Sequence, residues 1–123
     1  MNLLYEKETF LIIGAAIEVH KELGNGFLEA VYQEALEKEF EIKRIPYKRE
    51  VPFTIYYKNK PLNKQYFADF ICYDKIIIEL KTKSAICSEH QAQILNYLTA
   101  SKLKLGIILN FGKQSLEHQR IIK

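Results

Sequence analysis

Hydrophobic and polar positions follow two different periods along this chain, and the change of period divides it into helical and extended parts. Apolar residues recur at helical spacing over residues 6–23 and again over residues 27–42, which predicts two helices. Gly24 is placed to end the first helix in a left-handed conformation, and Asn25–Gly26 makes a tight link to an antiparallel second helix. The apolar positions that carry this spacing are Phe10, Ile13, Ala16, Ile17, Val19, Phe27, Leu28, Val31, Ala35, Leu36 and Phe40.

Beyond Pro46 the pattern changes to alternation, which predicts strands in place of helices. Pro52 argues for a strand at the edge of its sheet or for the beginning of a strand. The expected strands run over residues 51–57, about 64–72 and 76–81, with turns at 58–61 and 73–75. On the second strand the alternation places Tyr66 and Phe70 on one face and Phe67, Asp69 and Ile71 on the other. Three successive antiparallel strands of this kind form a meander.

The remainder of the chain adds one helix and two further strands. Residues 88–91, Ser-Glu-His-Gln, match a capping box, which predicts a third helix that ends near Ser101. The run from Leu105 to Phe111 is continuously apolar, as in a strand that is buried on both faces. Because a helix connects it to the strand at 76–81, we expect these two strands to be parallel. An edge strand over 115–122 completes an α/β class with a mixed central sheet flanked by helices.

The composition suits one compact domain. The chain has 123 residues, 48% of them hydrophobic, so we expect a single domain over residues 1–123. No apolar run approaches the roughly 18–20 residues that span a bilayer, and the acidic start MNLLYEKE lacks the basic segment of a signal peptide. We therefore expect a cytoplasmic protein without membrane contact. Cys72 and Cys87 form no CxxC pair, which favours reduced thiols.

The net charge of +3 hides an asymmetry between two parts of the chain. Residues 1–43 carry 4 lysines against 9 glutamates, a net of −5, whereas residues 44–123 carry 14 basic residues against 6 acids, a net of +8. The basic part is compatible with a polyanionic partner, although scattered lysines are more often plain solvated surface. By itself the charge is weak support for nucleic-acid binding.

Charged side chains interrupt the most apolar of the expected strands. Ile76–Ile78 is followed directly by Glu79, Leu80 and Lys81, and an unpaired charge buried in such a strand is strongly unfavourable. Alternation places Glu79 and Lys81 on one face with Leu80 on the other, and the hairpin register brings Asp69 opposite them. Two acids and a lysine are therefore expected to converge.

Polar residues on two of the expected helices are further candidates. Glu29 and Tyr32 lie three positions apart on one face of the second helix, and Leu36 continues that stripe. Periodicity alone favours an exposed Glu29, since this helix is rich in glutamate. On the third helix Gln93 and Tyr97 lie four positions apart and share a face.

Acid-rich sites of this composition suit Mg²⁺ or Mn²⁺, which prefer carboxylate, carbonyl and water oxygens. In phosphodiester hydrolysis such an ion polarises the phosphate and lowers the pKa of a bound water. A neighbouring lysine orients that water or meets the charge that develops in the transition state. The alternative is a structural ion pair of Lys81 with Glu79 or Asp69 at the surface of the sheet.

One string resembles the signature of a known family. Residues 26–32, Gly-Phe-Leu-Glu-Ala-Val-Tyr, have the form GxxExxY and are similar to the GxxExxY proteins, a branch of the PD-(D/E)XK nuclease superfamily. The resemblance covers nearly the whole chain and includes YFADFICYDKIIIELK, Gln93-x-x-x-Tyr97 and LGIILNFG, in that order. It implies a restriction endonuclease-like core, in which an antiparallel meander and a parallel crossover strand form the central sheet.

The resemblance also implies roles for individual residues. Asp69 and Glu79 would be the metal-binding acids, with the backbone carbonyl of Leu80 as a further ligand. Lys81 would be the catalytic lysine. Glu29 would complete the site as a helix acid, through a second metal or a metal-bound water.

Gln93 and Tyr97 resemble the QxxxY feature of exonuclease-like members of the superfamily, where it lines the site and helps to place the DNA end. Ala68 departs from the proline of the superfamily name, but this position is not a ligand. The leading hypothesis is a Mg²⁺- or Mn²⁺-dependent deoxyribonuclease of DNA repair, recombination or defence, with DNA favoured over RNA. A chain of this length has little room for a separate recognition domain, so we expect specificity to come from a homodimer or a protein partner.

Two other interpretations stay open at this stage. The chain could be a non-cleaving module for nucleic acid or protein that retains the nuclease fold, which the basic residues 44–123 favour. Alternatively, the acids could be purely structural. In that case substitution of Asp69 or Glu79 would clearly lower thermal stability, whereas removal of mutually repelling metal ligands often raises it.

Overall fold

The structure is a computed structural model and describes residues 3–123. Its elements follow in the order α1 (Glu6–Leu23), α2 (Glu29–Ile42), β1 (Tyr47–Tyr57), β2 (Lys60–Cys72), β3 (Ile76–Lys81), α3 (Ser88–Ser101), β4 (Leu105–Asn110) and β5 (Glu117–Ile122). Among the residues described, none of the helices is both long and apolar enough to cross a bilayer.

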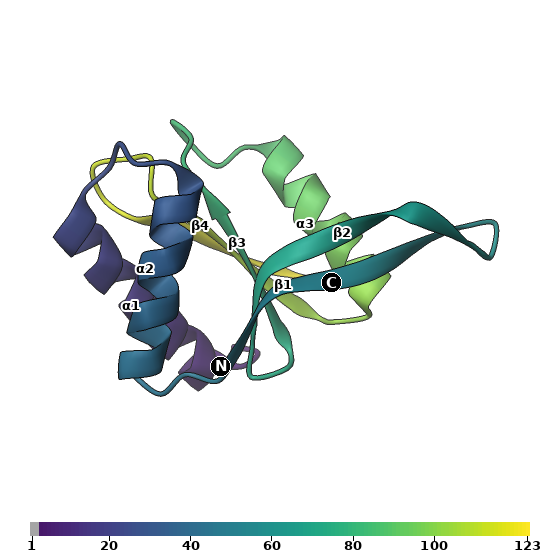
Figure 1. Cartoon of the computed structure of the whole chain (residues 1–123), viewed down its shortest axis with the longest axis horizontal. Coiled ribbons are helices and arrows are strands. Elements are labelled where there is room, and N and C mark those ends of the chain that lie inside the picture. Colours follow the sequence, from purple (N-terminus) through teal and green to yellow (C-terminus); the bar gives the residue numbers. More distant parts are fainter. Residues whose placement is uncertain (1–2) are drawn as a thin grey trace.

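The strands form one five-stranded sheet in sequence order, β1-β2-β3-β4-β5. β3 and β4 are parallel, and the other neighbouring pairs are antiparallel. Figure 1 shows α1 and α2 together on one side, away from α3, which crosses over between β3 and β4. The predicted α/β class, the meander and the parallel crossover are therefore confirmed.

Each face of the sheet carries its own apolar cluster. The larger cluster lies under α1 and α2 and contains Tyr32, Phe40, Phe70 and Phe111, all fully buried. The smaller cluster lies under α3, where Ile94 and Leu98 pack on the other face. The prediction of free thiols is also confirmed, with Cys72 buried and Cys87 exposed.

The first two helices meet the sheet through only part of the apolar positions that their spacing indicated: Ala16, Val19, Leu36 and Phe40 are buried, whereas others are exposed. Phe10 is 75% exposed and Leu28 is 78% exposed, so neither is a core residue. α1 also buries Ala15, which the predicted spacing did not include, beside Ala16, because small side chains allow a close approach to its neighbours. α2 begins at Glu29, so Phe27 and Leu28 precede the helix. α3 is capped by Cys87 with His90, one residue earlier than the predicted box.

The hairpin of β1 and β2 is longer than alternation predicted and projects beyond the rest of the sheet (Figure 1). β1 begins at Tyr47, and Pro61, predicted to lie in the turn, pairs within the hairpin. The turn itself consists of Lys58 and Asn59, both at positive φ, which matches the twist of a two-residue hairpin. As predicted from Pro52, β1 is an edge strand.

The prediction that Tyr66 and Phe70 share one face is wrong. Tyr66 belongs to the cluster under α3, whereas Phe70 belongs to the cluster under α1 and α2. The change of face occurs at Asp69, beside Glu50 of β1, whose φ of 55° interrupts the extended backbone. Alternation cannot reveal such an interruption, because it assumes an unbroken pleat.

Candidate active site

Asp69 lies where β2 and β3 part. The pairing of these strands covers three residue pairs and ends at Phe70–Ile78. Next to it, the Leu80 N–H donates to Asp69 Oδ2 at 2.8 Å, so a carboxylate takes the place of a backbone acceptor. Asp69 is half-buried, and burial raises the pKa of its carboxyl while the Leu80 N–H opposes the rise. The carboxylate is thereby held at the mouth of the gap between the strands.

Glu79 is buried beside Asp69, with 7% of its surface exposed. The hydroxyl of Tyr66 donates to Glu79 Oε1. Burial, followed by the negative charge of Asp69, raises the pKa of Glu79 to about 8. Ionisation of Glu79 beside Asp69 is therefore unfavourable, and a cation that binds both carboxylates would relieve their repulsion.

Lys81 follows two positions later on the same face of β3. Its Nζ donates to Gln93 Oε1 of α3 at 3.0 Å, and its carbonyl accepts the Phe111 N–H at 2.8 Å. Both ends of this residue are therefore anchored, the side chain by α3 and the backbone by the end of β4.

The loop after Lys81 is fixed by the neighbouring strand. Asn110 is fully buried and bonds both to the N–H and to the carbonyl of Lys83. A Cβ at Gly112 would collide with the backbone of Thr82 and Lys83, so this close approach requires glycine. These contacts define where β3 ends and hold the lysine in place.

Glu29 is the first residue of α2 and is exposed, as its periodicity indicated. After burial, the charges of Glu29 and Glu50 also raise the pKa of Asp69, so both acids lie near the gap. The link before α2 is held by Tyr32, whose hydroxyl donates to the Gly24 carbonyl at 2.5 Å and accepts the Phe27 N–H at 3.3 Å. These two hydrogen bonds give Tyr32 of the string Gly26–Tyr32 a structural role, because they fix the point at which α2 begins and so the position of Glu29.

The acid Glu50 was missed by sequence reasoning. Gln33 donates from its Nε2 to Glu50 Oε1 at 2.8 Å and to the Asp69 carbonyl at 3.3 Å, which ties α2 to both strands at the gap. The sequence contains one weak indication of Glu50, which is the only acid between residues 42 and 68. No pattern in the sequence indicates Tyr66, because tyrosines are common in strands.

The donor set fits a small hard cation. Within residues 3–123, no three His, Cys, Asp or Glu side chains are grouped so as to hold a metal ion by themselves. Mg²⁺ needs no such cage, because it keeps several waters and binds through one or two carboxylates and substrate phosphates. The adjacent carboxylates of Asp69 and Glu79, both with raised pKa, meet that requirement.

An aromatic stack leads away from this centre. Tyr97 of α3 stacks on Tyr66 with ring centroids 3.3 Å apart, and Tyr66 stacks on Phe53 of β1 at 5.8 Å. Tyr66 contacts Glu79 at the same time, so the rings connect the buried carboxyl to the surface of α3. The structure thus brings Asp69 and Glu79 together, with Lys81 and Gln93 beside them on the α3 face.

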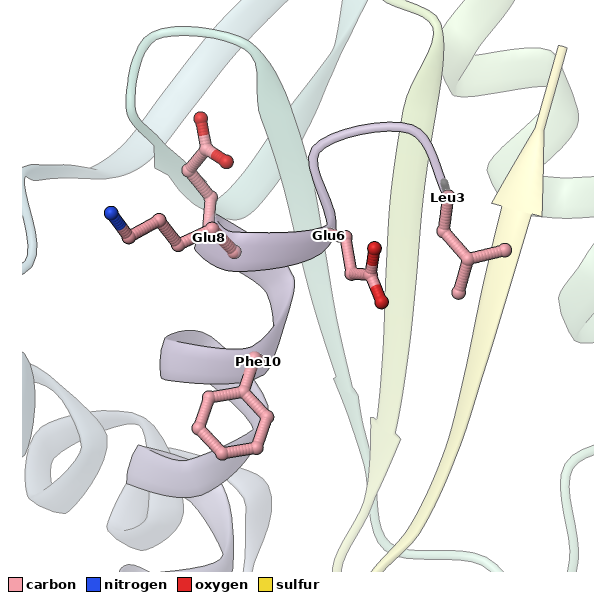
Figure 2. A pocket seen from close by; sticks show the side chains of 5 residues that line it. Leu3, Glu6, Glu8 and Phe10 are labelled. Carbon is pink, nitrogen blue, oxygen red and sulfur yellow. The ribbon is translucent and has the colours of Figure 1, made fainter. Parts of the chain in front are cut away.

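One hollow of the surface, of about 530 Å³, lies away from this centre at the start of α1. Figure 2 shows Glu6, Glu8, Leu3 and Phe10 around it. No candidate residue lines it. It is open and shallow, and we assign no function to it.

Comparisons with known proteins agree with this architecture. The family model of the PD-(D/E)XK nuclease superfamily matches residues 6–121. Among solved structures, the crystal structure of SSO0001 superposes with a TM-score of 0.54 and 17% sequence identity, over 94% of this chain and 77% of that one. At this identity the likeness concerns the fold alone. No curated protein matches the sequence.

Proposed function

Since the chain belongs to the PD-(D/E)XK nuclease superfamily, we propose that it is a Mg²⁺- or Mn²⁺-dependent nuclease that hydrolyses phosphodiester bonds of DNA. The observation that carries the proposal is the meeting of Asp69 and Glu79 at the parting of β2 and β3, with Lys81 on the same face as Glu79. We further propose that it belongs to the GxxExxY branch, on the string Gly26–Tyr32.

Asp69 and Glu79 would hold the metal ion, with the Leu80 carbonyl as a further ligand and Glu29 at the rim. When bound, the ion would polarise the phosphate and favour ionisation of the attacking water. Glu79 must first release its proton, and the Tyr66 hydroxyl on Oε1 favours the ionised form. The acidic start of α2 would then limit the approach of DNA to the side of α3.

Gln93 orients the Lys81 ammonium on the face of Glu79, and its positive charge lowers the pKa of that carboxyl against the effect of burial. In hydrolysis the water oxygen forms a bond to phosphorus and the bond from phosphorus to the ester oxygen breaks, while the proton of the water passes to solvent and the leaving oxygen is protonated. A lysine in this position steadies the negative charge that builds up on the phosphate oxygens. Its removal should cost about 10²–10³-fold in rate.

The test is cleavage of labelled single- and double-stranded DNA with Mn²⁺ by the wild type and by Lys81→Ala. The control is Lys83→Ala, since Lys83 is exposed and lies only two positions later. We expect cleavage that requires the metal, falls sharply in Lys81→Ala and persists in Lys83→Ala. Equal cleavage by Lys81→Ala and wild type would refute the assignment. DNA retention without cleavage that survives both EDTA and Asp69→Ala would instead support a non-cleaving module.

A further inference from the structure

A groove of about 610 Å³ lies between the projecting hairpin and α3. β1 contributes Thr54, Ile55 and Tyr56 to its lining, and α3 contributes Asn96 and Tyr97. Tyr97 also stacks on Tyr66, which contacts Glu79, so one ring separates the Tyr97 end of the groove from the candidate active site. The groove and the site therefore share the Tyr97–Tyr66 stack.

The charged residues of the two segments that form the groove are lysines. Residues 51–68 contain Lys58, Lys60 and Lys64 and no acid, and residues 90–104 contain Lys102 and Lys104 and no acid. Lys102 lines the groove directly. The glutamates of the chain are concentrated on α1 and α2, which cover the opposite face of the sheet. A polyanion would be attracted to the groove and repelled by the side of the molecule that α1 and α2 cover.

The groove also offers aromatic rings. Tyr56 is 64% exposed and lines the groove. Tyr57, 62% exposed, follows it on the other face of the hairpin, with the Lys58 ammonium 5.6 Å from its ring centroid. Exposed tyrosines on a basic arm are the combination that single-stranded nucleic acids use, because unpaired bases stack on the rings while lysines follow the phosphates. A duplex hides its base faces and cannot use the rings in this way.

We propose that this groove, defined by residues 54–56 of β1, residues 96–101 of α3 and Lys102 at the end of that helix, binds a single strand of nucleic acid and leads it to the candidate active site. That the strand leads to the active site rests on the proposed nuclease function. The binding of a single strand in the groove does not depend on that function. The strand would stack a base on Tyr56 and place its phosphates along Lys102 and, where it leaves the groove, along Lys58 and Lys60 at the tip of the hairpin.

Binding is measured by fluorescence anisotropy in EDTA, with a labelled oligothymidine of about 12 nucleotides and a duplex of the same length. We expect the wild type to prefer the single strand. Tyr56→Ala should weaken single-strand binding about tenfold, whereas Tyr56→Phe should retain it. The triple variant Lys58→Gln, Lys60→Gln, Lys102→Gln should weaken binding and lower the salt slope by about 0.7 for each phosphate that the protein no longer neutralises.

The matched controls lie on the helical side of the molecule. Phe10→Ala removes an aromatic ring that is 75% exposed on α1, and Lys7→Gln, Lys21→Gln, Lys38→Gln removes three exposed lysines of α1 and α2. Both should bind like the wild type. All of these side chains are exposed, and circular dichroism of each variant verifies the fold.

Equal binding by Tyr56→Ala and Phe10→Ala, tighter binding of the duplex, or displacement of DNA by polyglutamate at equal charge would each overturn the proposal. Failure of the nuclease function is a separate result, since it appears as cleavage unaffected by Lys81→Ala and leaves the anisotropy in EDTA unchanged. Loss of groove binding with intact cleavage would refute the groove alone.

Discussion

The two faces of the sheet are built differently. Among residues 3–123, the face under α1 and α2 has a cluster of 17 buried hydrophobic residues, whereas the cluster under α3 has seven. On the smaller face Glu79 is buried and Lys81 is half-buried. β3 contributes side chains to both faces. Ile78 and Leu80 point to the large cluster, and Glu79 and Lys81 point to the other face. The contrast indicates that one face supplies stability, which leaves the other free to carry charge that a core does not tolerate.

The largest expected effect comes from matched truncations on the two faces. Leu36 and Leu98 are both fully buried, the first in the large cluster and the second in the small one. We expect Leu36→Ala to cost about 4 kcal/mol of unfolding free energy and Leu98→Ala about 3 kcal/mol, because fewer buried side chains surround the cavity that Leu98→Ala leaves in the smaller cluster. Urea unfolding followed by circular dichroism measures both. A larger loss for Leu98→Ala would contradict the contrast.

Glu79→Gln should stabilise the metal-free protein at alkaline pH. The pKa of Glu79 is raised to about 8 from 4.5, so the folded state keeps a proton that the unfolded state has released, and stability falls as the pH rises between these values. The amide avoids this loss, and its oxygen can still accept from Tyr66. We expect a gain on the order of 2 kcal/mol at about pH 8 and none at about pH 4.

Thermal unfolding in EDTA across this pH range measures the gain. The control is Glu89→Gln, since Glu89 is exposed at the start of α3. A structural Glu79 would give the opposite result, namely a clear loss of stability in Glu79→Gln at every pH.

The smallest effects compare one tyrosine hydroxyl on each face. Tyr32→Phe removes the bonds to Gly24 and Phe27 and should cost about 1 kcal/mol of stability without a pH dependence. Tyr66→Phe removes the donor that favours ionised Glu79, so the pKa of Glu79 should rise further, by roughly half a unit to one unit.

The Tyr66→Phe shift is measured by unfolding in EDTA at several pH values, where the fall in stability should move to higher pH. An unchanged pH profile would show that Tyr66 has only a packing role. A pH-dependent loss in Tyr32→Phe would remove the distinction between the two faces.

Most of the fold was predictable because its patterns are local. The continuous apolar runs of β3 and β4, separated by one helix, were sufficient to predict a parallel pair, and Pro52 narrowed its position to the edge of the sheet or the start of a strand, of which the structure shows the edge. The exposed Phe10 and Leu28 were not predictable, because helical spacing does not tell which apolar stripe meets the sheet. The length of the hairpin also escaped prediction, since its tip is polar and gains its order from pairing.

The candidate site was predictable only in part. Asp69, Glu79 and Lys81 follow from charge within apolar strands, and their adjacency follows from a hairpin register. Their roles remain predictions. Glu50 and Tyr66 could not be found in this way. The position of Glu50 depends on its own left-handed backbone within β1, and the position of Tyr66 depends on the change of face at Asp69.

The sequence by itself determined the order and type of the elements and the residues that carry charge into β3, because both depend on spacing along one strand or helix. The tertiary structure decided which faces these residues share. The parting of β2 and β3 at Asp69 leaves the Leu80 N–H to a carboxylate, buries Glu79 against it and raises the pKa of both acids. These consequences arise from contacts between strands and from the exclusion of water, which no single segment contains.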